Sequence, residues 1–276
     1  MTTTIIFLVP LLLMLVRTPI AVALGLASAA GLLLSGINLE IMIQQIITTN
    51  DSFPLLAIPF FILAGEIMST GGMSRRLVDF AGALVGHFRG GLAAVAILGS
   101  SFFAALSGSN AATVAAIGGI MNAPMAEKGY RPSYTAATIA AAGVTGMIIP
   151  PSILLILYGV VTGVSISDLF LAGVIPGIFI CLSLLALNWF IVRGQNVERL
   201  AFQGSGEIVR TFKAAFFPLM MPVIILSGIY GGVFTPTEAA IVAVLYGLAV
   251  GIAFRELSWR SIVQALINAS ISSCVV

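Results

Sequence analysis

Long apolar stretches, separated by short polar ones, occupy most of this chain. They cover residues 4–16, 19–36, 54–69, 91–126, 133–162, 169–192, 214–230 and 237–254. Apolar runs of this kind predict helices that enter or cross a lipid bilayer. The pattern therefore predicts an all-α polytopic membrane protein.

One polar tetrapeptide, Ser107-Gly108-Ser109-Asn110, interrupts the middle of the apolar run 91–126. Each flank is 16 residues long, and a helix of that length spans roughly 24 Å, short of the ~30 Å hydrocarbon core. Two such limbs favour a re-entrant helical hairpin that turns inside the bilayer and leaves by the face it entered. Irregular polar backbone persists at that depth only where protein covers it or where it lines a cavity. The tetrapeptide therefore indicates a solute or ion site in the middle of the membrane.

A second interruption lies within the stretch 133–162, which at about 30 residues is longer than one crossing needs. Pro150 and Pro151 lack the N–H that a helix requires, so the carbonyl groups of Gly146 and Met147 lose their helical partners. A proline also moves the preceding residue out of the α region. The stretch therefore predicts a broken transmembrane helix whose bare carbonyl oxygens suit a cation.

The two interruptions together define the candidate site. Either one alone could be a kink or a close-packing contact, but the pair favours binding. The predicted cation-binding residues, which offer hydroxyl, amide and carbonyl oxygens, are Ser107, Gly108, Ser109, Asn110, Gly146, Met147 and Ile149. Ser109 or Asn110 can cap the second limb, whose positive N-terminal end suits an anion. The predicted substrate-binding residues are Asn110, Thr113, Thr145, Pro150, Pro151 and Ser152.

The coupling ion follows from the side chains at the interruptions. Neither interruption carries a carboxylate or a histidine that could relay protons, so Na+ is favoured over H+. No other metal, organic cofactor, catalytic residue or nucleic acid partner is expected. Outside the interruptions, Glu66 is the one carboxylate well inside an apolar segment, and it is either functional or close to the inner end of its helix. His87 is expected to be a solvated loop residue, and Asp79 to pair with Arg75 or Arg76 on its own helix.

Composition and charge support this picture. The chain is 59% hydrophobic and 8% charged, with a mean hydropathy of +1.15, which excludes the soluble classes. All twelve Lys and Arg residues can be placed on one side of the membrane, the cytoplasmic side, if 91–126 crosses an even number of times. Residues 39–49 and 73–88 mix apolar and polar positions, which is typical of interfacial helices.

Four regions follow from this pattern. They are N-terminal scaffold helices with an interfacial helix (1–53), a transport region with the hairpin and the broken helix (54–193), a cytoplasmic helical connector (194–213) and a last region (214–276). The short motif Thr18-Pro19 recurs as Thr235-Pro236 on the opposite side of the predicted membrane, as in an inverted repeat.

Four spaced runs give the chain a family resemblance. It resembles the large membrane subunit of the tripartite ATP-independent periplasmic (TRAP) transporters in the runs Ser52–Gly65, Ser107–Gly118, Gly146–Ser152 and Gly231–Ala240. The resemblance extends over essentially the whole chain. It implies an elevator-type ion-transporter-like fold in a multi-pass protein of the bacterial inner membrane. Because members of this family continue through a second repeat, it also implies that 214–276 begins a second repeat and that the inverted-repeat architecture is incomplete at the C-terminus.

The resemblance also implies a function. It indicates sodium-driven uptake of small organic acid anions, of the C4-dicarboxylate or sugar-acid type. A periplasmic solute-binding protein would deliver the substrate, and a small membrane subunit would brace the scaffold in the lipid bilayer. An ion or solute channel is the first alternative, although broken helices suit alternating access better. An intramembrane protease is the enzyme alternative, but Ser107 and Ser109 lack a G-x-S-x-G frame.

Overall fold

The computed structural model describes residues 2–70, 72–193 and 204–275, and every regular element in these ranges is a helix. The chain divides into two compact units, Met1–Ser52 and Phe53–Val276. The predicted regions 54–193 and 214–276 lie together in the second unit.

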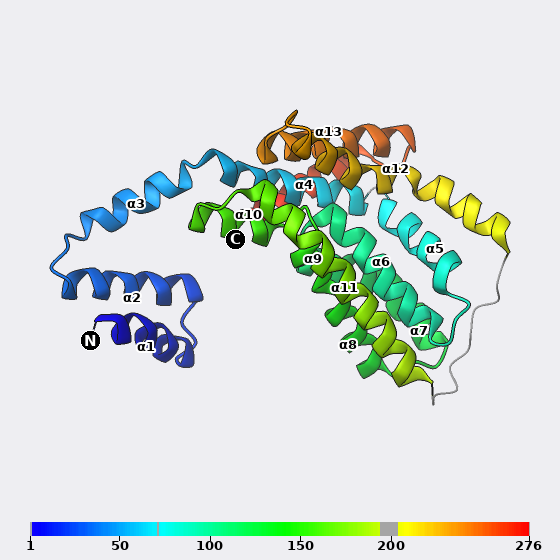
Figure 1. Ribbon diagram of the computed structural model, residues 1–276, viewed down its shortest axis with the longest axis horizontal. Coiled ribbons are helices and arrows are strands. Elements are labelled where there is room, and N and C mark those ends of the chain that lie inside the picture. The colour runs from blue at the N-terminus through cyan, green and yellow to red at the C-terminus, as the bar shows by residue number, and fades with distance from the viewer. Residues whose placement is uncertain (1, 71, 194–203, 276) are drawn as a thin grey trace. The chain divides into compact units, whose positions relative to one another are not determined.

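The first unit contains three helices (Figure 1): α1 (Thr2–Leu15), α2 (Ile20–Leu34) and α3 (Glu40–Asn50). Small residues let α1 and α2 pack closely, since a Cβ at Gly31 would lie 2.8 Å from Cγ1 of Ile6. The helices predicted over 4–16, 19–36 and 39–49 are confirmed as helices, and the interfacial position of the last one stays a prediction.

The second unit contains the remaining elements. They are the short 3-10 helix η1 (Phe53–Leu56), α4 (Ala57–Thr70), α5 (Met73–Val85), α6 (Gly91–Ser107), α7 (Asn110–Glu127), α8 (Pro132–Gly143), α9 (Thr145–Ile148), α10 (Ile153–Thr162), α11 (Ile166–Val192), α12 (Ser205–Tyr230), α13 (Pro236–Ala253) and α14 (Trp259–Val275).

These helices pack in two groups that meet at the hairpin. In the first group α6, α7, α8 and α11 lie side by side (Figure 1), and in the second α4 contacts both α13 and α14. Helix α5 joins the groups because it packs against α6 and against α12. Its apolar positions follow the helical period, and Met73, Leu77 and Ala81 are fully buried on one face. The amphipathic helix predicted over 73–88 is therefore confirmed as a helix.

Several helices are long and apolar enough to cross a membrane. Among the described residues these are Phe53–Thr70, α11, α12 and α13. The pair α8–α9 and α10, bent by 43° at its break, would be a fifth span. The broken helix predicted over 133–162 is thus confirmed. The hairpin predicted over 91–126 is confirmed as two helices joined by a tight turn, whereas its re-entry into a bilayer stays a prediction.

The polar connector differs from its expected form. Residues 194–203 lie outside the described part of the chain, and α12 begins at Ser205 and continues without interruption to Tyr230. The second half of the predicted connector is therefore the first part of a long helix. Its start is polar, with Glu207 and Arg210 one turn apart, and these two side chains form an ion pair that suits a helix end outside the apolar core.

Candidate cation and substrate site

The hairpin turns at the predicted tetrapeptide. Helix α6 ends at Ser107, and Gly108 reverses the chain with a φ of +59°, a left-handed conformation that glycine adopts without steric cost. Ser109 then caps α7, because its side-chain oxygen accepts a hydrogen bond of 3.4 Å from the N–H of Ala112. Of the two predicted caps, Ser109 is therefore the cap, and Asn110 is the first residue of the helix.

Hydroxyl groups stabilise the turn from within. The Thr113 hydroxyl donates to the Ser109 carbonyl oxygen at 2.7 Å, and the Ser107 hydroxyl oxygen lies 3.1 Å from that of Thr113. The Ser107 hydroxyl also lies 3.4 Å from the Ser109 carbonyl oxygen, so the two hydroxyl groups and this carbonyl form one cluster. Both side chains are almost completely buried. Thr113 therefore supports the turn from inside in this structure.

The break between α9 and α10 lies where the sequence predicts it, but one of its carbonyl groups is capped. Ile149 is extended, with a ψ of 121°, and the peptide bond between Pro150 and Pro151 is cis. The Met147 carbonyl oxygen is not bare, contrary to the prediction, because the Ser152 hydroxyl donates to it at 2.6 Å. The serine directly after Pro151 thus replaces the N–H that this proline lacks. The Gly146 carbonyl oxygen accepts no hydrogen bond within the described ranges.

The hairpin tip and the break meet through their backbones. The N–H of Ile153, the first residue of α10, donates to the Gly108 carbonyl oxygen at 3.1 Å. Two glycines allow this approach, since a Cβ at Gly108 would lie 2.6 Å from the Pro151 carbonyl oxygen, and a Cβ at Gly146 would lie 2.8 Å from that of Ser109. The two interruptions that the sequence separates by about 40 residues therefore form one junction.

Asn110 carries an unpaired acceptor at this junction. Its Oδ1 atom is buried and has no hydrogen-bond donor among the described residues. A Cβ at Gly143 would collide with this same atom, so the amide fits against α8 only because residue 143 is glycine. A buried oxygen without a donor is costly unless a ligand pairs with it. Asn110 is therefore the strongest single candidate for a cation ligand.

A cavity of about 550 Å³ opens beside the junction. Its lining includes five of the predicted cation-binding residues, namely Ser107, Gly108, Ser109, Asn110 and Met147. Of the predicted substrate-binding residues only Asn110 lines it. The others are buried behind this surface: Thr113, Thr145, Pro150, Pro151 and Ser152.

Glu66 lines the same cavity. The two interruptions carry no carboxylate, but α4 adds Glu66 to the lining of the cavity that they share. No local pattern shows that Glu66 lies near the hairpin tip, since residues 66 and 107 are far apart along the chain. The sequence indicates only that an acidic residue within an apolar segment is often functional.

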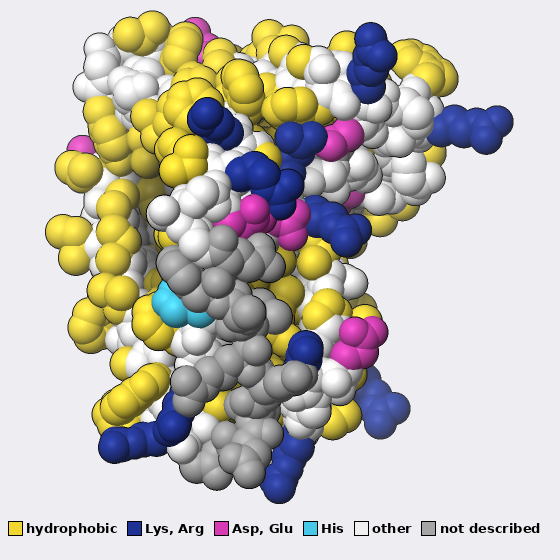
Figure 2. Space-filling view, turned by 90° about the vertical axis from the view of Figure 1, so that its right-hand side faces the viewer, with side chains coloured by type: hydrophobic (Ala, Val, Ile, Leu, Met, Phe, Trp, Pro, Cys, Tyr) yellow, Lys and Arg dark blue, Asp and Glu magenta, His cyan; other side chains and the backbone are white. Residues whose placement is uncertain are grey.

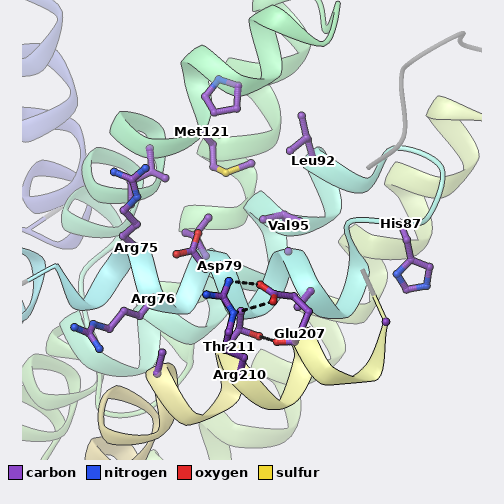
Figure 3. A pocket seen from close by; sticks show the side chains of 17 residues that line it. Arg75, Arg76, Asp79, His87, Leu92, Val95, Met121, Glu207, Arg210 and Thr211 are labelled. Carbon is purple, nitrogen blue, oxygen red and sulfur yellow. Dashed lines mark hydrogen bonds and ion pairs between the residues drawn. The ribbon is translucent and has the colours of Figure 1, made fainter. Parts of the chain in front are cut away.

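A second cavity, of about 560 Å³, lies between α5, α6, α7 and α12. Figure 3 shows Asp79 between Arg75 and the Glu207–Arg210 pair, and Figure 2 shows acidic and basic side chains gathered on the surface. Arg76 pairs with Glu256 at 2.5 Å and stacks over the ring of Phe254, 3.9 Å from its centroid. Of the two arginines that the sequence offers as partners of Asp79, Arg76 is therefore engaged with Glu256 in the loop after α13, and Arg75 is the one whose charge acts on Asp79.

Burial raises the pKa of the Asp79 carboxyl group, against the opposing effect of the nearby Arg75 and Arg210. A raised folded-state pKa contributes stability below the unfolded value of about 3.9, and this contribution is lost as the pH rises through the folded value. Asp79→Asn should therefore stabilise the protein at pH 7, by up to about 1 kcal/mol because partial exposure screens the charge. Melting curves should show no gain near pH 3.5. Asp51→Asn, at an exposed aspartate, is the control, and an equal gain there would contradict this explanation.

A buried asparagine that the sequence did not single out positions the base of the hairpin. Asn188 on α11 is 4% exposed. Its Oδ1 accepts from the Tyr134 hydroxyl at 2.6 Å, and its Nδ2 donates to the Gly90 carbonyl oxygen at 3.3 Å. It therefore joins α8 and α11 to the residue that precedes α6. An amide near the end of a 27-residue apolar helix was the available signal.

Helices that can span a bilayer, a hairpin and a broken helix define a multi-pass membrane protein of the transporter class. The family model of the tripartite ATP-independent periplasmic transporters, DctM component, matches residues 7–276. The chain belongs to this family. The curated relatives that it matches are named permease proteins of TRAP transporters, and the family together with the apolar helices indicates a multi-pass protein of the inner membrane.

Named relatives agree with the family model. The chain is 44% identical to the C4-dicarboxylate TRAP transporter large permease protein DctM of Vibrio cholerae, over 89% of this chain and 55% of that protein. It is 41% identical to the 2,3-diketo-L-gulonate TRAP transporter large permease protein YiaN of Escherichia coli, over 92% and 62%. It is 42% identical to the isethionate TRAP transporter permease protein DctMQ of Oleidesulfovibrio alaskensis, over 96% and 42%. The chain spans about half the length of the curated relatives it matches.

Proposed function

We propose that this chain forms part of a sodium-coupled carrier that takes up small organic acid anions across the inner membrane by an elevator-type movement. The observation that carries the proposal is the junction of hairpin tip and break, where Asn110 is part of the cavity lining and its buried Oδ1 atom has no donor among the described residues. Oxygen atoms from discontinuous helices are the usual cation ligands of secondary carriers, and helix N-termini point at anionic substrates. In this proposal the Gly146 carbonyl oxygen, which accepts no hydrogen bond within the described ranges, is a further ligand of this kind.

The names of the relatives support the substrate class. C4-dicarboxylates, 2,3-diketo-L-gulonate and isethionate are all small organic anions. Helix α7 begins at the cavity with its positive N-terminal end, which favours a carboxylate or sulfonate group there. A periplasmic solute-binding protein that delivers the anion and a small membrane subunit are the partners in this proposal. In the same proposal, the loops that carry Lys and Arg face the cytoplasm.

The test is sodium binding by the purified chain in detergent, measured with radioactive sodium. Ser107→Ala, Asn110→Ala and Pro151→Ala should each weaken binding, since one lost or displaced ligand costs roughly 1–3 kcal/mol, or about 5- to 150-fold in affinity. Asn122→Ala, at an exposed asparagine on α7, is the matched control and should bind sodium like the unchanged chain. Unchanged sodium affinity in all three site variants would refute the proposed site.

Transport needs a separate measurement. In liposomes that contain the complete transporter, counterflow of labelled organic anion distinguishes a carrier from a channel, because only a carrier exchanges internal for external substrate at a binding site. Sodium-dependent counterflow is the expected result. Flux that shows no counterflow would favour the channel alternative.

A further inference from the structure

Glu66 lies at the level of the hairpin tip. Its neighbour Gly65 packs directly against the end of α6, where a Cβ would lie 3.0 Å from the Cα of Ser107. Helix α4 can approach the turn this closely only because residue 65 has no side chain. Glu66 therefore lies one turn before the end of α4 and beside the turn that carries the candidate cation ligands.

The carboxylate is held by a chain of amides from α14. The Nδ2 atom of Asn268 donates to Oε2 of Glu66 at 3.3 Å, and Nε2 of Gln264 donates to Oδ1 of Asn268 at 2.9 Å. Because Gln264 satisfies the oxygen of the Asn268 amide, the amide must turn its N–H groups toward Glu66. Asn268 is thus a positioning residue for the carboxylate.

Among the described residues, the charge of Glu66 has no partner of opposite sign. Within the described ranges no Lys or Arg forms an ion pair with it, and its one side-chain hydrogen bond comes from a neutral amide. It is also the only ionisable residue in the lining of the 550 Å³ cavity. A carboxylate in a membrane-spanning helix is expensive unless a cation or a proton compensates it. The tip, in turn, offers a cation only neutral oxygens.

We propose that Glu66 supplies the negative charge of the cation site at the hairpin tip, and that Asn268 positions it. This assignment rests on the proposed function, because it names the charged member of the same site. The tip oxygens would contact the ion, and Glu66 would compensate its charge from across the cavity. A carboxylate within several ångströms contributes substantially at the reduced dielectric of such a site.

The experiment compares variants that differ in charge but little in shape, using radioactive sodium and the purified chain. Glu66→Gln removes the charge and should weaken sodium binding about 10- to 100-fold. Glu66→Asp keeps the charge and should recover most of the affinity. Asn268→Ala should weaken binding only about 2- to 5-fold, because the carboxylate remains but is less well oriented. Glu127→Gln, at an exposed acid at the end of α7, controls for the loss of one negative charge and should have no effect.

The outcomes separate this assignment from the proposed function. If Asn110→Ala weakens sodium binding and Glu66→Gln does not, the site stands and the role of Glu66 is wrong. If Glu66→Asp binds as poorly as Glu66→Gln, charge is not what matters and the assignment fails. If the unchanged chain shows no saturable sodium binding, the proposed function is wrong. The role assigned to Glu66 is then wrong as well. Without sodium, Glu66→Gln should melt at the same temperature as the unchanged chain or at a higher one, because the uncompensated carboxylate is costly there. A lower melting temperature would show that Glu66 has a structural role instead.

Discussion

Gly108→Ala is expected to cause one of the largest losses of stability in this protein, about 2–5 kcal/mol. A left-handed conformation costs a residue with a Cβ about 1–2 kcal/mol. The added methyl group would also lie 2.6 Å from the Pro151 carbonyl oxygen and 3.3 Å from the Cα of Ser152, and overpacking of this kind adds about 1–3 kcal/mol. The melting temperature in detergent should fall by roughly 5–15 °C, and sodium binding should weaken as well.

Gly119→Ala is the matched control for this variant. Gly119 lies in the middle of α7, and a Cβ there would meet nothing within 4 Å. Alanine should be neutral or stabilising at this position by about 0.5–1 kcal/mol, because glycine weakens a helix interior. If both variants lower the melting temperature equally, the close approach of hairpin tip and break is not the cause.

Asn188→Ala is the second substitution with a large expected effect, a loss of about 2–4 kcal/mol. It removes the donor to the Gly90 carbonyl oxygen and the acceptor of the Tyr134 hydroxyl, and a buried group left without its partner costs about 1–3 kcal/mol. The base of the hairpin should loosen, so proteolysis between α5 and α6 should become faster. Denaturant titration measures the free energy, and the proteolytic rate measures the local opening.

Two further variants are compared with Asn188→Ala for their loss of stability. Tyr134→Phe removes only one of the two hydrogen bonds and should cost about half as much. Asn122→Ala changes an exposed asparagine on α7 and should stay within about 0.5 kcal/mol of the unchanged chain. Equal stability of Asn188→Ala and Asn122→Ala would show that the buried amide does not hold the hairpin base.

Most of the helices could be predicted from the sequence because their signals are local. The hairpin follows from one polar tetrapeptide within an apolar run, and the broken helix follows from two adjacent prolines. The bounds of α12 were less predictable. The connector over 194–213 is predicted as helical, but hydropathy does not show that this polar helix, with Glu207 and Arg210, continues without a break into the apolar stretch that follows.

The candidate site was predicted only in part, because half of it depends on contacts between distant segments. The carbonyl of Met147 was expected to be bare because a proline lacks the N–H that would bond it. The Ser152 hydroxyl donates to it instead, and the prediction did not include this side-chain contact. Glu66 reaches the hairpin tip through the packing of Gly65, which no sequence period encodes. Arg76 likewise finds its partner in Glu256, far along the chain. The oxygen atoms of the hairpin turn could thus be predicted from sequence patterns. The carboxylate of Glu66 joins them only through tertiary packing.

The hydrogen bond from the N–H of Ile153 to the carbonyl oxygen of Gly108 has a mechanical consequence. It joins two main chains directly, so neither the hairpin tip nor the break can be displaced without the other unless this bond opens. In the proposed elevator-type movement, oxygens contributed by the two segments would therefore keep their spacing. An ion bound between them would keep the same ligands at the same distances during the movement. Its coordination energy would therefore stay constant along the path.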